Sequence, residues 1–397
     1  MRSPRSTPSA SAAVAAGWSP ASEKGETSRN VPCKATLKVI RRGVGAARSE
    51  PQGLPARPRS QPLSTTPLLF SGSSNPQLAE AIAKRMKISL GDALVTKFKN
   101  EETRIEIREN VRGAEVFVVQ SICKAPNGNG VNDALVELLL MIDALRRASA
   151  ARITAVVPYY GYAKQDKKTK PREPISAKVV ANLLKTTGSK RVVTMDLHAA
   201  QIQGFFDIPV DNLMAMPTLC NYLKREGLSD DRIVVVSPDA GGVHRAELFA
   251  KRLNASLAIV FKRRPQPDVS EVTDIVGDVK GKVAVIVDDM ISTGGTLAKA
   301  AEAIKARGAT SVHTVATHGL FADNAIEVLA NSVIERVIVT DTIPILQPAG
   351  EKFIQLSIAQ TFADAIGRIT TNRSVSELFS VEEIKIDANF VEPVTVS

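Results

Sequence analysis

Aromatic residues and cysteines are scarce in this chain of 397 residues. Aromatic residues make up 4% of it, and none of its 3 cysteines belongs to a CxxC pair, which excludes a disulfide scaffold and a cysteine-based zinc site. No run of about 18 uncharged apolar residues occurs, so a membrane span is excluded. No GxxxxGKS or GxxxxGKT sequence occurs, which excludes a P-loop nucleotide hydrolase. The apolar content of 44% is enough for two domains with sizeable cores.

Acidic residues are nearly absent from the first 65 residues, which we call the leader. The leader holds 11 of the 51 Lys and Arg but only 3 of the 41 Asp and Glu, so it carries +8 of the net charge of +10. The remaining body is close to neutral, which argues against nucleic-acid binding. The leader is rich in Ser, Thr, Ala and Pro and has no sustained apolar periodicity, so we expect it to be disordered.

This composition is typical of an organellar transit peptide, and an unprocessed disordered tail is the alternative. The Ser, Thr and Pro content favours a plastid address. A mitochondrial address is the other possibility, although it would call for a clearer amphipathic helix carrying arginines. The cleavage position does not follow from the sequence.

Short apolar runs recur from Leu68 onward, and each is about as long as a strand. Their apolar residues are consecutive rather than alternating, which indicates strands covered on both faces, as in parallel sheets. The runs are 116–120, 153–158 and 191–196 in the first half and 233–239, 283–289 and 335–341 in the second.

Helical patterns lie between these runs. Residues 133–148 place leucines and an isoleucine on one stripe behind an Asn132 or Asp133 cap, and residues 296–308 end in a basic turn followed by Gly308. Alternating strands and helices predict βαβ units. Two such sets predict two similar α/β domains, over residues 66–213 and 214–397, after the leader of residues 1–65.

The most informative segment is VAVIVDDMISTGGTLAKA, residues 283–300. An apolar strand ends in Asp288 and Asp289, and a short loop with two glycines then opens a helix near Thr296. Ligands of open α/β sheets bind at the carboxyl ends of strands. The glycines let backbone N–H groups approach an anion at the helix N-terminus. Two carboxylates beside such a cradle suit sugar hydroxyls or Mg²⁺ rather than the phosphate itself.

This loop is similar to the 5-phosphoribosyl-pyrophosphate loop of the type I phosphoribosyltransferase fold. With the segments around it, the chain from about residue 68 to 380 resembles the ribose-phosphate pyrophosphokinase (PRPP synthetase) family, in its phosphate-dependent class and an organelle-targeted plant type. The segments that carry the resemblance are SGSSNPQLAEAIA (71–83), KFKNEETRIEI (97–107), NVRG (110–113), PYYGYAKQDKK (158–168), MDLHAAQIQGFFDIPVDNL (195–213), SPDAGG (237–242), FKRRP (261–265), VGDVKGK (276–282) and DTIP (341–344).

The resemblance implies a reaction and a fold. The family transfers the β,γ-diphosphoryl group of ATP to the anomeric oxygen of ribose 5-phosphate and releases AMP, so catalysis should rest on positioning and on cationic stabilisation. The implied fold has two similar doubly wound parallel-sheet domains of the type I phosphoribosyltransferase fold, with the site between them. Implied cofactors are Mg²⁺ and inorganic phosphate as an activator. The resemblance also implies a homo-oligomer in which dimers build a hexamer, and inhibition by ADP. Whether isoforms assemble together stays open.

The resemblance also implies site residues. Catalytic cations are Lys262 and Arg264, in a strand-end basic loop at 260–268 that would otherwise be a solvated surface. The remaining sets are Phe98, Asn100, Glu102, Lys164 and Gln165 for ATP; Asp288, Asp289, Ser292, Thr293, Gly294, Gly295 and Thr296 for ribose 5-phosphate; and His198, Asp239, Asp196, Asp207 and Asp211 around Mg²⁺. Asp207 and Asp211 suit a structural role equally well. The glycine turn of SPDAGGVHR (237–245) suits a pyrophosphate or is only a connector.

Four features depart from the family pattern. Lys164 replaces an arginine, Ser292 replaces an acidic residue, and Thr169 stands where some members carry Asp. The loop at 124–131 holds an insertion of about five residues. These changes concern nucleotide affinity and rate more than reaction type. The alternatives are a phosphoribosyltransferase, which would need neither KFKNEET nor FKRR, and a non-catalytic regulatory subunit, in which the catalytic loop would be interrupted. A nucleic-acid-binding regulator would need a basic domain that the body lacks.

Overall fold

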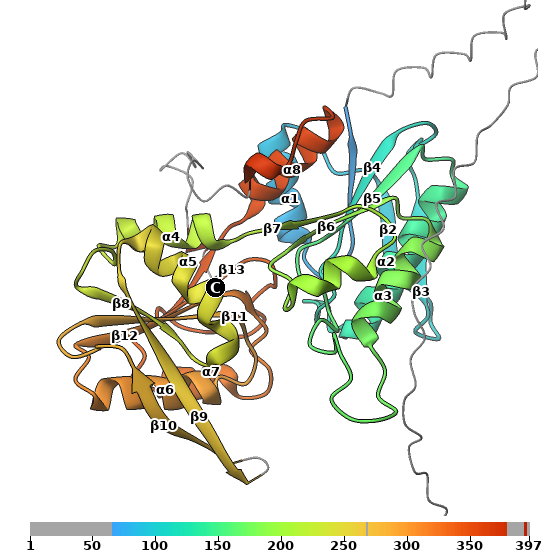
Figure 1. The fold of residues 1–397 in the computed structure, drawn as a ribbon. Helices are drawn as coiled ribbons and strands as arrows, with labels where there is room; N and C mark the ends of the chain where they lie inside the picture. The colour runs from blue at the N-terminus through green and yellow to red at the C-terminus, as the bar shows by residue number, and fades with distance from the viewer. Residues whose placement is uncertain (1–65, 267–268, 379–392, 395–397) are drawn as a thin grey trace, which may run out of the picture. The chain divides into compact units, whose positions relative to one another are not determined.

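The computed structural model of the chain describes residues 66–266, 269–378 and 393–394 (Figure 1). The predicted disorder and transit function of residues 1–65 lie outside the described residues. No helix in the described part is long and apolar enough to cross a membrane.

The first half of the body is built on a five-stranded parallel sheet with the order β1-β4-β5-β6-β7. Helices α2 and α3 cover one face, and α1 packs on the other. A separate hairpin, β2–β3, packs against α2. The elements are β1 (Leu68–Ser71), α1 (Pro76–Met86), β2 (Ala93–Lys97), β3 (Thr103–Ile107), β4 (Glu115–Val119), α2 (Val131–Arg147), β5 (Arg152–Val157), α3 (Ser176–Thr187), β6 (Arg191–Met195), η1 (Ala200–Phe205) and β7 (Val210–Leu213).

The second half is built on a larger sheet with the order β10-β9-β8-β11-β12-β13-β14-β15. The strands from β9 to β14 are parallel, and β10 and β15 join the two edges antiparallel. The elements are α4 (Met216–Arg225), β8 (Ile233–Ser237), η2 (Ala240–Gly242), α5 (Val243–Leu253), β9 (Ser256–Gln266), β10 (Val269–Val276), β11 (Val283–Ile291), α6 (Gly295–Ala306), β12 (Ser311–Gly319), α7 (Ala325–Ala330), β13 (Arg336–Thr340), β14 (Phe353–Leu356), α8 (Ala359–Thr370), η3 (Ser376–Leu378) and β15 (Pro393–Val394).

Burial explains why the apolar runs form strands. Every residue of β4 and β8 is buried, as expected for parallel strands covered on both faces. The predicted α/β fold with parallel sheets is therefore confirmed. The predicted cap of α2 is wrong by two residues or more: Gly130 is the N-cap, and Asp133 lies one turn inside the helix, where its carboxylate accepts the Gly130 N–H at 2.8 Å.

Helix α8 belongs to the second half of the chain by sequence but packs against α1 of the first half (Figure 1). One hydrophobic core joins both sheets through α1, α4, α5 and α8. The sequence places α8 after the last parallel strand, but nothing in it indicates that this helix packs against the first half of the chain. The proposed boundary near residue 213 falls between β7 and α4 and stays a prediction.

Asp341, whose carboxyl is buried, connects α8 and α1 to the end of β13. Its Oδ1 accepts the Ile358 N–H at 2.9 Å, and its backbone carbonyl accepts a hydrogen bond from the Asn75 amide at 2.7 Å. Burial raises the pKa of Asp341 to about 6, above the unfolded value of about 3.9. The folded protein therefore retains this proton longer than the unfolded chain, and the contribution of Asp341 to stability falls as the pH rises from 4 to 6.

We expect the free energy of unfolding of Asp341→Asn to rise, relative to that of the unmodified protein, by about 3 kcal/mol between pH 4 and pH 7. Asparagine keeps the acceptor for Ile358 and cannot ionise. Urea unfolding at a series of pH values measures the difference. Asp278→Asn, at an exposed carboxyl, is the control for the loss of one carboxyl. A pH-independent difference for Asp341→Asn would show that this carboxyl does not titrate on folding.

Candidate active site

A cavity of about 550 Å³ lies at the point where the strand order of the large sheet reverses. The chain goes from β8 outward to β9 and then returns to β11 on the other side of β8. In open α/β sheets, ligands bind at the carboxyl ends of the strands at such a point. The polar lining comes from both halves of the body: Lys164, Asp166, Lys167, His198, Gln201, Asp239, Gly241, Gly242, Arg245, Asp288, Asp289, Ser292, Thr293, Gly294 and Thr296.

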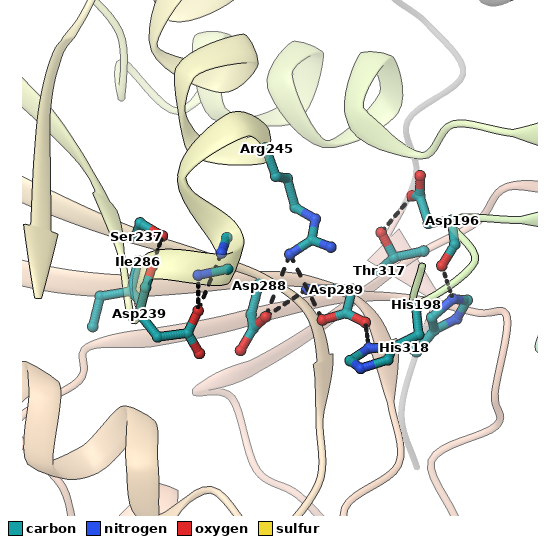
Figure 2. Close-up of polar contacts among 12 residues, drawn as sticks. Asp196, His198, Ser237, Asp239, Arg245, Ile286, Asp288, Asp289, Thr317 and His318 are labelled. Carbon is teal, nitrogen blue, oxygen red and sulfur yellow. Dashed lines mark hydrogen bonds and ion pairs between the residues drawn. The ribbon is translucent and has the colours of Figure 1, made fainter. Parts of the chain in front are cut away.

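Two adjacent carboxylates at the end of β11 face a cation and a histidine (Figure 2). Arg245 Nη1 lies 3.4 Å from Asp288 Oδ1 and 3.6 Å from Asp289 Oδ1. His198 Nδ1, from the first half of the chain, lies 2.6 Å from Asp289 Oδ2. The arrangement brings together residues from three segments that are far apart in sequence, and it fixes Asp289 from both sides.

The two carboxyls differ in their affinity for a proton. Burial and the adjacent Asp289 carboxylate raise the pKa of Asp288 to about 7. Burial acts on Asp289 in the same direction, but the hydrogen bond with His198 and the charge of Arg245 outweigh it and hold the pKa of Asp289 below its usual value. The same hydrogen bond raises the pKa of His198. At neutral pH Asp289 therefore stays charged, whereas Asp288 binds a proton more readily than an ordinary aspartate does.

The glycine loop after β11 leads directly into α6. Gly294 has a φ of +75°, and a Cβ there would lie 2.9 Å from Leu329 Cγ, so this position needs glycine for conformation and for space. No side chain caps α6, and its first N–H groups are available for an anion. Of the predicted sugar-phosphate residues, all but Gly295 line the cavity.

The second glycine turn, after β8, is closed by hydrogen bonds to its own aspartate. Asp239 Oδ1 accepts the N–H groups of Gly241 at 2.9 Å and Gly242 at 3.1 Å. The turn is therefore closed on its own aspartate and does not hold these two N–H groups free for a pyrophosphate. Asp239 and both glycines line the cavity, and the Oδ2 of Asp239 makes no hydrogen bond within the described residues.

The five residues predicted around Mg²⁺ are not brought together. His198 and Asp239 line the cavity. Asp207 pairs with Lys185 on the surface, and Asp211 on β7 pairs with Arg191 on β6. Asp196 Oδ2 accepts hydrogen bonds from the Thr317 hydroxyl and the Ala215 N–H. These partners satisfy the three aspartates away from the cavity lining. No group of three or more His, Cys, Asp or Glu side chains is placed to hold a metal in the part of the chain described.

The predicted ATP residues divide into two sets. Lys164 lines the cavity, but Gln165 does not, and its amide oxygen accepts a hydrogen bond from Ser176. Phe98, Asn100 and Glu102 lie on the β2–β3 hairpin and its turn, outside the cavity lining. The Phe98 ring is about half exposed, and its described contact is the Arg104 guanidinium 5.5 Å from its centre.

The predicted catalytic segment is a strand rather than a loop. Lys262 and Arg264 lie in β9, which pairs antiparallel with β10, with Lys262 opposite Val272. Residues 267 and 268 of the segment, and the side chains of Lys262 and Arg264, lie outside what the structure describes. Their predicted role stays a prediction.

Four polar residues of the cavity were missed in the sequence: Asp166, Lys167, Gln201 and Arg245. Asp166 is buried and accepts a hydrogen bond from Gln201 at 2.5 Å, so the two form one wall. Arg245 could have been found, because it follows the Gly turn by one helical turn and so faces the same strand ends. Gln201 lies on the short helix η1, and nothing in its spacing points to the cavity.

A second cavity, of about 480 Å³, is mostly apolar. Its lining includes Tyr159, Phe321, Ile326, Ile343 and Leu346. Such a lining suits an apolar group, whereas the cavity at β11 offers three cations and a helix N-terminus. The β11 cavity is therefore the better match for a phosphorylated substrate.

Comparison with known proteins gives the same result from independent sequence matches. Residues 67–188 match the model of the N-terminal domain of ribose phosphate pyrophosphokinase, and residues 265–380 match the phosphoribosyl synthetase-associated domain. Ribose-phosphate pyrophosphokinase from Fusobacterium nucleatum is 51% identical over 313 residues, covering 79% of this chain and 98% of that protein. The one from Caldanaerobacter subterraneus is 53% identical over 315 residues, covering 79% and 97%.

A solved structure agrees with these relatives. The crystal structure of phosphoribosylpyrophosphate synthetase from Mycobacterium smegmatis is 44% identical, superposes with a TM-score of 0.71, and covers 77% of this chain and 99% of that one. On this identity and coverage, the chain belongs to the ribose-phosphate pyrophosphokinase (PRPP synthetase) family.

Proposed function

We propose that the chain transfers the β,γ-diphosphoryl group of ATP to the anomeric hydroxyl of ribose 5-phosphate. In this reaction the anomeric oxygen bonds to the β-phosphorus, the bond from that phosphorus to the oxygen of the α-phosphate breaks, and AMP leaves. The observation that carries the proposal is the β11 cavity: an acid pair, buried at Asp289 and partly buried at Asp288, and a phosphate loop face His198 and two lysines of the other half. Family membership supports the same activity.

The sugar side of the site follows from charge. The loop of Ser292 to Thr296 and the N-terminus of α6 bind the 5-phosphate through N–H groups and hydroxyls. Asp288 and Asp289 bind the ribose hydroxyls, because a carboxylate accepts hydrogen bonds and repels phosphate. The raised pKa of Asp288 favours its protonated form, which lessens this repulsion. Arg245 holds both carboxylates in place and offers its remaining N–H groups to a phosphate oxygen.

The nucleotide side carries the remaining cations, Lys164 and Lys167, for the ATP phosphates. Mg²⁺ fits the site as a part of the Mg²⁺–ATP substrate, because the protein offers single donors rather than a closed cage. Those donors are Asp239 Oδ2 and His198 Nε2, which have no hydrogen-bond partner among the described residues. His198 Nδ1 faces the charged Asp289 and so carries the proton, which leaves Nε2 to accept. When bound, the ion neutralises phosphate charge.

The purified full chain, given ATP, ribose 5-phosphate, Mg²⁺ and phosphate, should form AMP and PRPP in equal amounts. Phosphorus NMR and chromatography of the nucleotides measure both products in one reaction. ADP in place of AMP would contradict diphosphoryl transfer. A phosphoribosyltransferase would instead consume PRPP in the presence of a base, and a non-catalytic subunit would form neither product.

We also propose that the chain belongs to the phosphate-dependent class, with inorganic phosphate as activator and ADP as inhibitor, as the sequence resemblance implies. The assay above without added phosphate tests this.

We further propose that residues 1–65 direct the protein to the plastid stroma, with the mitochondrion as the alternative. Their composition supports this, and a fluorescent fusion of residues 1–65 imaged with markers for both organelles tests it.

Assembly into a homo-oligomer, with dimers building a hexamer, is proposed on two grounds. The outer faces of α2 and α3 leave large apolar side chains exposed, among them Val136, Leu140, Val179 and Leu183, which an interface would cover. Phe98, Asn100 and Glu102 do not line the chain's own cavity, so they reach adenine only if a second subunit presents them. Light scattering after gel filtration should give the mass of six chains, and co-purification tests assembly with isoforms.

A further inference from the structure

Two neighbouring side chains of β12 hold the bend that follows β6 (Figure 2). Thr317 donates its hydroxyl hydrogen to Asp196 Oδ2 at 2.6 Å. His318 Nε2 lies 3.2 Å from the Met195 carbonyl oxygen and 3.3 Å from that of Asp196. β12 belongs to the large sheet and β6 to the small one, so these contacts join the two halves of the site at the carboxyl ends of their strands.

The histidine is fixed by its other nitrogen. His318 is buried, and its Nδ1 lies 2.9 Å from the Thr342 hydroxyl. Carbonyl oxygens only accept hydrogen bonds, so Nε2 carries the proton and Nδ1 accepts from Thr342. A neutral imidazole with both nitrogens engaged can take one orientation only, and burial lowers the pKa of His318, which keeps it neutral.

The bend that these residues hold is strained. Asp196 has a φ of +39°, in a region that residues with a side chain seldom adopt, and such a conformation persists only where surrounding contacts enforce it. Besides Thr317, the Ala215 N–H donates to Asp196 Oδ2 at 3.0 Å. The carboxylate of Asp196 is therefore the point at which the bend is fixed, and the metal role expected for it from the sequence stays a prediction.

The bend leads directly to the active site. His198 follows Asp196 by two residues, and its Nδ1 lies 2.6 Å from Asp289 Oδ2 on β11. β11 is the neighbour of β12, with Met290 opposite His318 in the register. The arc of residues 196–198 is thus attached at one end to β12 and at the other to the catalytic end of β11.

We propose that Thr317 and His318 are positioning residues that hold the bend at Asp196, so that His198 meets Asp289 in the orientation the reaction needs. They touch no substrate. This inference rests on the proposed diphosphoryl transfer, because that reaction needs the acid pair and the phosphate-side donors to be held in fixed positions relative to each other. A displacement of about 1 Å in a reacting group can lower turnover by about 100-fold.

The test compares two valine substitutions on one strand. Thr317→Val keeps the shape and removes the hydrogen bond to Asp196. Thr314→Val removes a hydroxyl that is just as buried and binds the Ile286 carbonyl oxygen at 3.4 Å, away from the bend. We expect Thr317→Val to lower kcat by about 10-fold to 100-fold with a smaller change in either KM, and Thr314→Val to leave kcat within about twofold.

A double-mutant cycle with His198→Ala distinguishes a positioning role of Thr317 from a merely structural one. If Thr317 acts through His198, Thr317→Val should lower kcat by less than about twofold once His198 is gone, because residues that act as a unit do not add. Equal losses in both backgrounds would overturn the proposal. His318→Gln, which can keep a donor at the place of Nε2, should retain more turnover than His318→Leu.

The outcomes separate this inference from the proposed function. If the unmodified chain forms no PRPP, the proposed function fails. If it forms PRPP and Thr317→Val behaves like Thr314→Val, only the positioning role fails. If Thr317→Val does not fold, the comparison of His318→Gln with His318→Leu decides in its place, and equal turnover of those two variants overturns the proposal.

Discussion

Lys262→Ala should lower kcat by about three orders of magnitude or more while the KM values for ATP and ribose 5-phosphate change little. The transferred group passes through a loose transition state in which charge gathers on its equatorial oxygens, and one positioned cation at that point is worth about 10³-fold to 10⁵-fold in phosphoryl transfer. A cation that acts mainly in the transition state changes turnover rather than substrate binding. Steady-state assays of AMP formation measure both quantities.

The control for this prediction is Lys299→Ala. Lys299 is an exposed lysine of α6, outside the cavity lining, and its loss removes the same charge from the chain. We expect its kcat to stay within about twofold. A large rise in the KM for ATP with unchanged kcat in Lys262→Ala would mean that Lys262 binds the ground state only, and its catalytic role would then be wrong.

The sequence is sufficient to locate the sugar-phosphate loop because that part of the site is local. The strand β11, its two terminal aspartates, the glycine turn and α6 are consecutive in the chain, and each is set by a pattern that a short window contains. The consecutive apolar residues of β4 and β8 predict parallel strands for the same reason. These elements need only burial on both faces and a left-handed turn at Gly294 to form as predicted.

The rest of the site depends on contacts between distant segments, which no short window contains. His198 and Asp289 are 91 residues apart, and Arg245 reaches the acid pair from a helix whose own sequence looks like a solvated amphipathic surface. Asp207 and Asp211 are acidic, near a strand end and close to His198 in sequence, yet lysine and arginine neighbours satisfy them elsewhere. Proximity in sequence could not distinguish them from Asp196, whose carboxylate fixes a bend.

The β9–β10 hairpin and the position of α8 show the same limit on the scale of elements. The basic segment around Lys262 contains Pro265 and many charges, which is typical of a loop, but pairing with β10 extends it as a strand. Helix α8 has the amphipathic pattern of any surface helix, and the pattern does not say which sheet it covers. Both features are decided by tertiary partners.

Asp289→Asn should lower kcat/KM for ribose 5-phosphate by about 10²-fold to 10³-fold, as the loss of one preorganised polar group at a reacting centre commonly does. Asparagine has the same shape but no charge, so it no longer holds the His198 proton and the Arg245 guanidinium as a carboxylate does. Because His198 and Arg245 keep the pKa of Asp289 low, the charge removed is one that the protein carries throughout the neutral range.

The matched variant is Asp288→Asn, and it should lose less activity than Asp289→Asn, because burial and the neighbouring Asp289 carboxylate raise the pKa of Asp288 and favour its protonated form. An amide resembles that protonated form. The comparison that decides is which variant loses more kcat/KM, since each changes one carboxyl of the same pair. Asp278→Asn, at an exposed carboxyl before β11, controls for the change in net charge. If Asp288→Asn proves as damaging as Asp289→Asn, or more so, then the charge that the reaction needs sits on Asp288, and the division of roles drawn from His198 and Arg245 is reversed.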